Sequence, residues 1–418
     1  MTPCLGQSRR FRWVVCALLF FGTLINYTDR QILAQIKGIL DNELHWTAFD
    51  YGLVNSGFQA SYAVSVLFFG WFVDRFGVKR GYAVSAAAWS VMAGLHSAVQ
   101  SVGGFLVARI GLGLSEGGNF PAAIKGVTEW FPRHERALAT SLFNSGANVG
   151  AFLAPAVVPA IALTWGWRPA FILASLAGFA WVVTWLMVYR EPAQQVAPRI
   201  DNTDPHARSP AWRSLLRKRA TWAFVSAKLL TDPVWWFFLI WLPDLFKRVY
   251  GLDIRGSGHK VAAIYATITV LSIAVAWFTG RLAVRGLTMT RARKTMMFAC
   301  AVAVIPVWII PTLDVWPAVM VLAIAGAAHQ AWSANLYSTV SDMFPGSVVA
   351  SVIGFGTVAG AVGGMLFPLY SGYVLDSFRA VGREADGYAH LLHLCAFAYL
   401  ITFALHHWLA PRFEPAVQ

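Results

Sequence analysis

Long apolar stretches recur from one end of the 418-residue sequence to the other. A helix needs about 20 mostly apolar residues to cross a bilayer, and a scan at that length gives twelve candidate spans. The candidates cover residues 12–36, 50–73, 82–100, 103–124, 137–162, 168–189, 220–246, 260–280, 295–312, 316–340, 348–375 and 388–410. Little of the chain remains for a soluble domain, so we expect an all-α membrane protein with twelve transmembrane helices.

The composition agrees with this fold class. Hydrophobic residues make up 57% of the chain and charged residues only 13%, well below the quarter or so usual in soluble domains. A net charge of +13 would suggest a nucleic-acid partner in a soluble protein, but here the basic residues form short clusters between apolar spans. Lys and Arg are concentrated in the alternate segments that include both termini, which predicts a multi-pass protein of the cell (inner) membrane with both termini cytoplasmic. Its partners are then lipid and a small solute, with no nucleic acid, and a monomer is expected.

The cysteines indicate neither a metal site nor a disulfide framework. Cys4, Cys16, Cys300 and Cys395 show no Cys-x-x-Cys or Cys/His spacing, and three of them lie in or beside apolar runs. The basic, apolar N-terminal segment has no small-residue cleavage signature, so it is expected to remain as the first helix. We expect no cofactor.

One long polar stretch divides the chain into two sets of six spans. It reads "REPAQQVAPRIDNTDPHARSPAWRSLLRKR" from Arg190 and is rich in Pro, Ala and charge, as a linker is. The predicted organisation is a six-helix bundle over residues 1–189, a cytoplasmic linker over 190–219 and a second six-helix bundle over 220–418. The linker's last ten residues fit either a basic amphipathic helix on the membrane or a solvated linker end.

An internal repeat supports this division. The segment "GLSEGGNFPAAIKGVTEWFP" from Gly113 aligns without gaps on "GAAHQAWSANLYSTVSDMFP" from Gly326. The same offset pairs Gly150 with Gly363. Two related halves around a central site are the architecture that alternating-access transporters use.

Asp29 and Arg30 are predicted to lie inside the membrane. The apolar run before them, "WVVCALLFFGTLI", has 13 residues, about 20 Å of helix, and the hydrocarbon core is about 30 Å thick. The helix must therefore continue through "NYTDRQILAQ", where a charge costs at least about 2.5–3.5 kcal/mol. Adjacent helical residues point about 100° apart, so the two side chains can serve different partners. A functional role and a structural pairing, with each other or through a third group, both remain open.

The fourth span carries a second pair of charged residues, Arg109 and Glu116, seven positions apart on one helix face. Gly117 and Gly118 follow and loosen the helix. Buried carboxyl groups with no cation beside them exchange protons near neutral pH, which suits Asp29 or Glu116 in a proton-coupled carrier. The alternative for Glu116 is a static salt bridge to an arginine.

Other polar residues within the spans have plainer explanations. Lys125, at the inner end of the fourth span, is expected to snorkel to the interface. Lys228 and Asp232, four residues apart, are expected to pair with each other. Trp235 and Trp236 fit either a flat surface for a sugar or a lipid-facing position.

The second half offers neutral groups at the repeat positions. His329 aligns with Glu116, and Gln330 and Asn335 lie close to it in sequence. Gln330 and Asn335 are candidates for hydrogen bonds to a substrate, whereas a structural role for His329 is equally compatible with the sequence.

The loop "GWFVDRFGVKR" provides a candidate gating motif through Gly70, Asp74, Arg75, Gly77 and Arg80. Asp74 is expected to meet a helix N-terminus, and the cations to meet phosphates or carbonyl ends. The pattern matches the G-x-x-x-D-R-x-G-x-[KR]-[KR] signature of the major facilitator superfamily. "NYTDR" and "SEGGNFPAAIKGVTEWFPRHERALATSLFNSGANVGAFLAP" resemble the anion:cation symporter family within it, especially its transporters of hexuronates and other sugar acids.

This resemblance implies proton symport of an organic anion. It implies that Arg30 holds the carboxylate and that Tyr27 and Tyr62 bind hydroxyl groups. Asp29 and Glu116 would handle protons, with Arg109 interacting with this acidic pair. Trp236, Gln330 and Asn335 complete the expected substrate site.

The expected substrate is a hexuronate such as glucuronate or galacturonate. The alternatives are an aldonate, an aldarate or another carboxylate. A membrane sensor that does not transport is a further alternative, whereas an intramembrane enzyme is not expected, because the sequence shows no cluster of metal-ligating residues such as an HExxH motif. One departure concerns the second copy of the loop motif, where Val284 replaces the aspartate and predicts a gate that is either weaker or differently latched.

Overall fold

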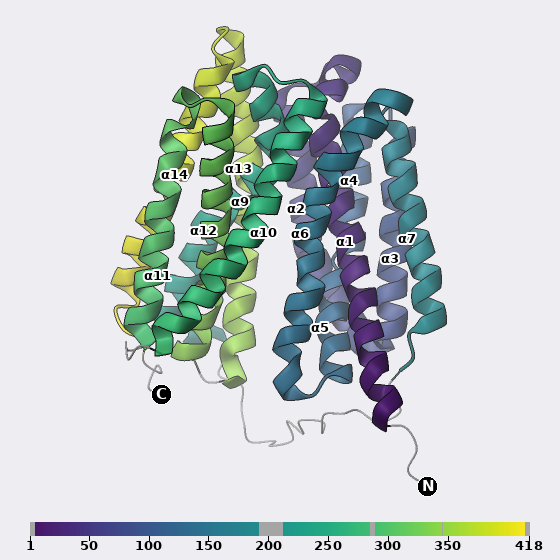
Figure 1. Ribbon diagram of the computed structural model, residues 1–418, viewed down its shortest axis with the longest axis vertical. Helices are drawn as coiled ribbons and strands as arrows, with labels where there is room; N and C mark the ends of the chain where they lie inside the picture. Colours follow the sequence, from purple (N-terminus) through teal and green to yellow (C-terminus); the bar gives the residue numbers. More distant parts are fainter. Residues whose placement is uncertain (1–4, 192–211, 285–288, 345, 414–418) are drawn as a thin grey trace. The chain divides into compact units, whose positions relative to one another are not determined.

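The computed structural model describes residues 5–191, 212–284, 289–344 and 346–413, and these residues form helices joined by short turns, without strands (Figure 1). The helices are α1 (Leu5–Leu44), α2 (Ala48–Phe76), α3 (Val78–Leu95), η1 (His96–Ala98), α4 (Val102–Glu116), α5 (Asn119–Trp130), α6 (Arg133–Trp165), α7 (Arg168–Val188), α8 (Trp212–Leu216), α9 (Arg219–Tyr250), α10 (Ile254–Val284), α11 (Met289–Val304), η2 (Ile305–Thr312), α12 (Val315–Met343), α13 (Gly346–Ala380) and α14 (Glu384–Leu409).

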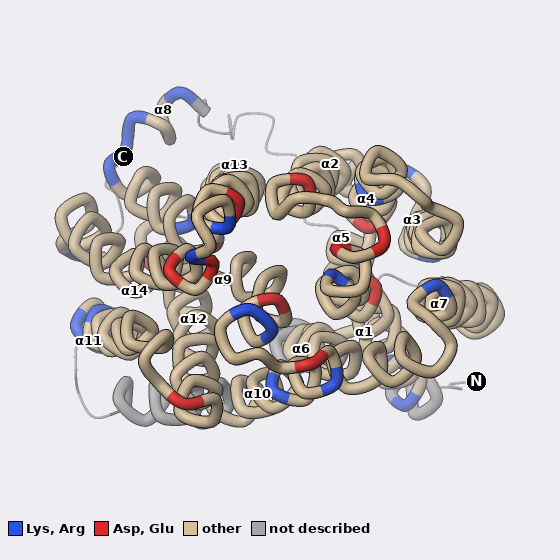
Figure 2. The backbone as a smooth tube through the Cα atoms, turned by 90° about the horizontal axis from the view of Figure 1, so that it is seen from above, with Lys and Arg blue, Asp and Glu red and all other residues tan. Residues whose placement is uncertain are grey.

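The predicted fold class is confirmed. Twelve helical crossings are present in the described ranges when α4 with α5, and α11 with η2, are each taken as one crossing. Nine helices of this part of the chain are long and apolar enough by themselves to cross a membrane. Seen from above, most of the backbone belongs to residues other than Lys, Arg, Asp and Glu (Figure 2). At 40 residues, about 60 Å, α1 runs well past Asp29 and Arg30, as the short apolar run requires.

The chain forms two compact units, one from residues 1–46 and 57–204, the other from residues 47–56 and 205–418. Most of the predicted linker, residues 192–211, lies outside the described part of the chain. At its end, the one-turn helix α8 is joined to the start of α9, because the Thr221 hydroxyl donates to the carbonyl of Leu215 and the Trp222 indole donates to that of Leu216, each at 2.7 Å. The first turns of α2 belong to the second unit, which the sequence did not indicate.

The glycines aligned by the internal repeat have equivalent positions in the two units. A Cβ on Gly150 of α6 would lie 2.5 Å from the Leu24 carbonyl oxygen of α1. A Cβ on Gly363 of α13 would lie 2.6 Å from the Leu229 carbonyl oxygen of α9. In both units the first helix and its partner therefore pack backbone to backbone, as small residues allow in membrane helices. This equivalence supports the reading of the two halves as a repeat.

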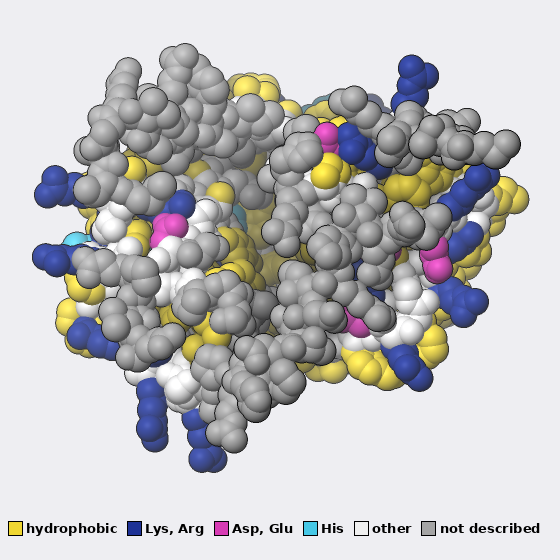
Figure 3. Space-filling model, turned by 90° about the horizontal axis from the view of Figure 1, so that it is seen from below, with side chains coloured by type: hydrophobic (Ala, Val, Ile, Leu, Met, Phe, Trp, Pro, Cys, Tyr) yellow, Lys and Arg dark blue, Asp and Glu magenta, His cyan; other side chains and the backbone are white. Residues whose placement is uncertain are grey.

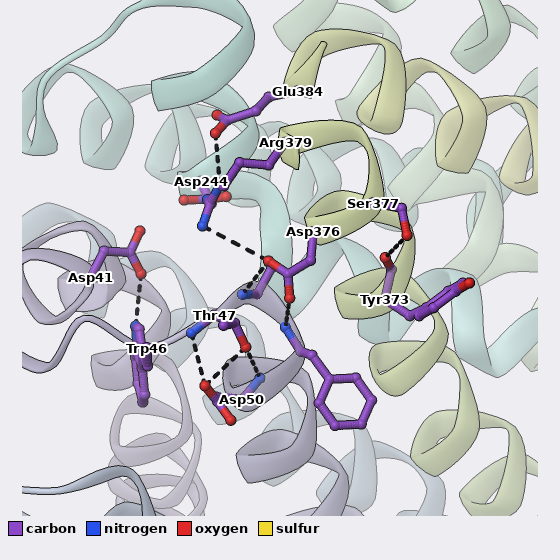
Figure 4. Close-up of polar contacts among 12 residues, drawn as sticks. Asp41, Trp46, Thr47, Asp50, Asp244, Tyr373, Asp376, Ser377, Arg379 and Glu384 are labelled. Atoms are coloured by element: carbon purple, nitrogen blue, oxygen red, sulfur yellow. Dashed lines mark hydrogen bonds and ion pairs between the residues drawn. The ribbon is translucent and has the colours of Figure 1, made fainter. Parts of the chain in front are cut away.

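The start of α2 is capped by a carboxylate from α13. Asp376 accepts hydrogen bonds from the backbone N–H groups of Ala48 at 2.9 Å and Phe49 at 2.7 Å (Figure 4). Arg379 lies 3.9 Å from Asp376 and donates to Glu384 at 2.7 Å. The first N–H groups of a helix have no intrahelical acceptor, and negative charge is stabilised there. Asp376 therefore supplies from another helix the cap that α2 needs.

The contact continues along the next two turns of α2. The Tyr51 hydroxyl donates to the Ile240 carbonyl at 2.9 Å, and the Ser56 hydroxyl donates to the Met365 carbonyl at 2.6 Å. A Cβ on Gly52 would lie 2.3 Å from the Pro368 carbonyl oxygen. Polar and backbone contacts thus bind residues 47–56 to α9 and α13 over their whole length.

We predict that Asp376→Ala lowers the stability of the protein by about 0.5–2 kcal/mol, because two N–H groups of α2 lose their acceptor. The measurement is the apparent unfolding temperature of the purified protein in detergent. The control is Asp386→Ala, which removes an ion pair to Arg383 in which both side chains are at least half exposed. Equal unfolding temperatures for the two variants would contradict the capping role.

Candidate functional site

A buried ion pair joins α1 and α4 at the centre of the first unit. Arg30 donates through Nε to Glu116 Oε2 at 2.6 Å. The side chains are 7% and 0% exposed, so water does not screen the pair. Of the two arrangements expected for Glu116, the structure therefore shows the salt bridge to an arginine.

Asp29 takes a different direction from its neighbour. It is 2% exposed, and neither carboxylate oxygen has a hydrogen-bond partner among the residues that the structure describes. It lies within electrostatic range of Glu116, Arg109 and Arg30. A buried carboxylate without a hydrogen bond is costly as an anion, so this position favours a group that takes up a proton.

Arg109 completes the charged cluster from the other end of α4. It is 1% exposed, and its Nη2 donates to the backbone carbonyl of Arg30 at 3.2 Å. Two arginines and two carboxylic acids thus share one buried region of a single unit, and Arg109 and Glu116 lie on one face of α4, as their spacing predicted. Their formal charges cancel when both acids are ionised.

Aromatic rings surround the guanidinium group of Arg30. Its Cζ lies 4.9 Å from the ring centroid of Tyr27, 4.4 Å from that of Tyr62 and 5.2 Å from that of Phe58. Both tyrosines were predicted to belong to the site. Phe58 was missed, although it lies four residues before Tyr62 and so on the same face of α2.

A break between α4 and α5 places Glu116 at a helix end. The last carbonyl groups of α4 lack helical partners, and two serine hydroxyls serve them: Ser65 donates to the Leu114 carbonyl and Ser85 to the Ser115 carbonyl, each at 2.5 Å. A Cβ on Gly117 or Gly118 would lie 2.4 or 2.5 Å from the oxygen of Ser65 or Ser85. Because both residues are glycines, α2 and α3 can approach the break closely enough for these hydrogen bonds.

A buried polar network continues from this break. Asn119 Oδ1 accepts from the Tyr82 hydroxyl at 2.5 Å and the Thr23 hydroxyl at 3.4 Å, while its Nδ2 donates to Asn26 Oδ1 at 3.5 Å. All four side chains are at most 1% exposed. The sequence analysis did not identify them, because asparagine and tyrosine in an apolar span have no distinctive spacing.

The predicted residues of the second unit do not form a connected group. Asn335 is buried, and its amide donates to the carbonyl of Ala331 in its own helix. Trp236 packs against Gly364 of α13, where a Cβ would lie 2.7 Å from the indole. Gln330 is half-buried on α12. In the described ranges no hydrogen bond or ring contact joins the three.

Two other expectations for the second unit have clear outcomes. Lys228 and Asp232 form an ion pair at 2.6 Å, as predicted. Trp235 stacks on His329 with ring centroids 4.9 Å apart, and His329 Nδ1 lies 2.5 Å from the Tyr399 hydroxyl. His329 therefore has structural partners on two other helices.

The gating motif lies at the turn from α2 to α3. Gly77 has φ +83°, a conformation that favours glycine. It is the one residue between the end of α2 and the start of α3. Arg75 and Arg80 are exposed, and a Cβ on Gly70 would meet open space. The second copy of the motif includes residues 285–288, which lie outside the described ranges, and nothing is described of the Val284 side chain.

An ion pair lies at this turn. Lys125 Nζ donates to Asp74 Oδ1 at 2.9 Å and to the Val73 carbonyl at 3.0 Å. The Asp74 side chain is 76% exposed, so the lysine reaches the exposed end of α2, which agrees with the expected snorkelling. The expected contact of Asp74 with a helix N-terminus stays a prediction. Lys125 belongs to α5, so spacing within one helix could not reveal its partner on α2.

Comparison with known proteins identifies relatives across the chain. The model of the Major Facilitator Superfamily matches residues 19–368. The hexuronate transporter of Escherichia coli (strain K12) is 30% identical over 99% of this chain and 96% of its own length. The galacturonate transporter of Dickeya chrysanthemi is 29% identical over 60% of this chain and 76% of its own length. A solved structure of a bacterial homolog of the human lysosomal transporter Spinster has a TM-score of 0.77 and 17% identity, covering 96% of this chain and 97% of that one.

We predict that Glu116→Leu destabilises the protein by roughly 3 kcal/mol, because Arg30 then keeps a buried charge without its partner. Adding Arg30→Met to this variant should recover most of the loss, since a buried pair replaced by apolar groups is often neutral. The measurement is a double-mutant cycle on thermal unfolding in detergent. The exposed pair Arg383–Asp386 is the control and should give a coupling below about 1 kcal/mol. A double variant as unstable as Glu116→Leu would contradict this account of the pair.

Proposed function

We propose that this chain, which belongs to the Major Facilitator Superfamily, imports a hexuronate together with protons. The protein is a membrane transporter and not an enzyme. Two of its relatives are transporters of hexuronate and of galacturonate, which supports a sugar acid as the substrate. The observation that carries the proposal is the buried pair of Arg30 and Glu116 with Asp29 beside it.

Arg30 is suited to bind a carboxylate. Glu116 occupies only the Nε edge of the guanidinium group. The two terminal nitrogens carry four further N–H groups in a planar fork, which matches the geometry of a carboxylate. Tyr27 and Tyr62 lie over the same guanidinium, so their hydroxyls are near the anion that it holds and can serve the sugar's hydroxyl groups.

Charge balance links the substrate to protons. With Arg30, Arg109, Asp29 and Glu116 all ionised the site is neutral, and a bound monoanion leaves one uncompensated negative charge. Such a charge costs several kcal/mol in a buried site. A proton on Glu116 or Asp29 removes this cost, and a proton on Glu116 also releases Arg30 to the substrate. We therefore expect at least one proton to be transported with each monocarboxylate.

The orientation proposed is a multi-pass protein of the inner membrane with both termini cytoplasmic, acting as a monomer. Twelve crossings place both termini on one side. Lys and Arg side chains project from the face at which α1 starts (Figure 3), and basic residues are typical of cytoplasmic segments. The Asp74–Lys125 pair of the gating motif then lies on the cytoplasmic side of the first unit.

We predict gradient-stimulated uptake of a sugar acid by proteoliposomes that contain the purified protein. Labelled glucuronate, galacturonate, galactonate and glucarate are offered with and without an inward proton gradient. Glucuronate or galacturonate should accumulate when the gradient is present and only equilibrate without it. An absence of gradient-stimulated uptake for all four anions would overturn proton symport.

We predict different losses for the charged residues. Arg30→Ala should weaken substrate binding at least about 30-fold, the equivalent of about 2 kcal/mol, because the carboxylate loses its cation. Asp29→Asn and Glu116→Gln should retain exchange of internal for external substrate but lose accumulation, because an amide side chain neither takes up nor releases a proton. Exchange and accumulation are measured in the same proteoliposomes, with Arg383→Ala as an exposed-arginine control. Wild-type accumulation in both amide variants would remove the two acids from coupling.

A further inference from the structure

Phe58 contacts both arginines of the charged cluster. The Cζ atom of Arg30 lies 5.2 Å, and that of Arg109 5.6 Å, from the centroid of its ring. Tyr27 and Tyr62 lie over Arg30, and Phe58 stacks on Tyr62 with ring centroids 5.9 Å apart and planes 14° apart. Phe58 is 4% exposed. It is therefore a buried aromatic surface shared by the two cations.

The position of Phe58 is set by α4, the helix that carries Arg109 and Glu116. Gly113 lies on α4 between Arg109 and Glu116, and a Cβ there would be 2.5 Å from the carbonyl oxygen of Phe58. The backbone of α2 is thus pressed against α4 at this residue. Because Arg109 also donates to the carbonyl of Arg30, the ring and both guanidinium groups form one packed group.

An aromatic face has a property that a carboxylate lacks. It attracts a guanidinium through its quadrupole while leaving the in-plane N–H donors unoccupied. When Glu116 takes up a proton, Arg30 loses its anionic partner before the substrate has replaced it. During that interval the rings are what hold the guanidinium in its binding position.

We propose that Phe58 is a positioning residue that keeps Arg30 ready for the substrate carboxylate and keeps Arg30 and Arg109 at a fixed spacing. Phe58 has no hydroxyl, so it offers the sugar no hydrogen bond, and its effect on binding acts through the arginines. This inference rests on the proposed function for its substrate, but the positioning of Arg30 is measurable without one.

The transport test compares Phe58→Leu with Phe58→Tyr, which keeps the ring. Phe58→Leu should raise the half-saturating concentration of glucuronate or galacturonate about 5- to 30-fold, with the number of protons per substrate unchanged. Phe58→Tyr should stay within about twofold of wild type. The matched control is Phe69→Leu, because Phe69 is a buried phenylalanine of the same helix whose ring contacts are Phe68 and Phe72. Phe58→Met gives the same comparison if the leucine variant does not fold.

A second readout is independent of transport. In protein labelled with ¹⁵N-arginine, the Nε–H resonance of Arg30 is identified by its loss in Arg30→Lys. Phe58→Leu should shift or broaden this resonance, while Phe58→Tyr and Phe69→Leu should leave it in place. An unmoved resonance, or wild-type half-saturation in Phe58→Leu, overturns the proposal. If wild type transports none of the sugar acids, the proposed function fails and the resonance alone decides the role of Phe58.

Discussion

The rest of the first unit depends on keeping two arginines and two carboxylic acids buried inside a membrane. The pair of Arg30 and Glu116 is nearly dry, so its attraction is little screened. Glycines let the surrounding helices pack closely: Gly113 brings α4 against α2, and Gly150 brings α6 against α1. At the end of α4, Ser65 and Ser85 supply hydrogen bonds to the Leu114 and Ser115 carbonyls, which a buried helix end requires.

The sequence was informative where a length or a spacing limits the possibilities. A 13-residue apolar run is too short to cross a bilayer, so Asp29 and Arg30 had to lie within the helix, and they do. Spacing also predicted the pair of Lys228 and Asp232, since both partners lie on one helix. The partner of Lys125 and the role of Phe58 were missed because the residues that they contact come from other helices. Contacts between side chains of two helices depend on how each helix is rotated about its axis and how the two pack. The periodicity of the sequence carries neither piece of information.

The two units have different electrostatic roles. The first contains acids and arginines from α1 and α4 in one buried cluster. In the second, Lys228 already has its own acid one turn away, and His329, at the repeat position of Glu116, is held by Trp235 and Tyr399. A duplicated scaffold has thus kept its glycine contacts while its charged positions diverged. Gln330 and Asn335 were chosen for their chemistry, and the structure gives them positions on α12 without joining them into a group.

The first nine residues of α2 belong to one compact unit and its remainder to the other. Asp376 and the α13 backbone hold its first turns, and about three turns later Phe58 and Tyr62 lie over the guanidinium group of Arg30. One continuous helix thus carries both the segment that belongs to the second unit and the ring that touches the two buried arginines of the first.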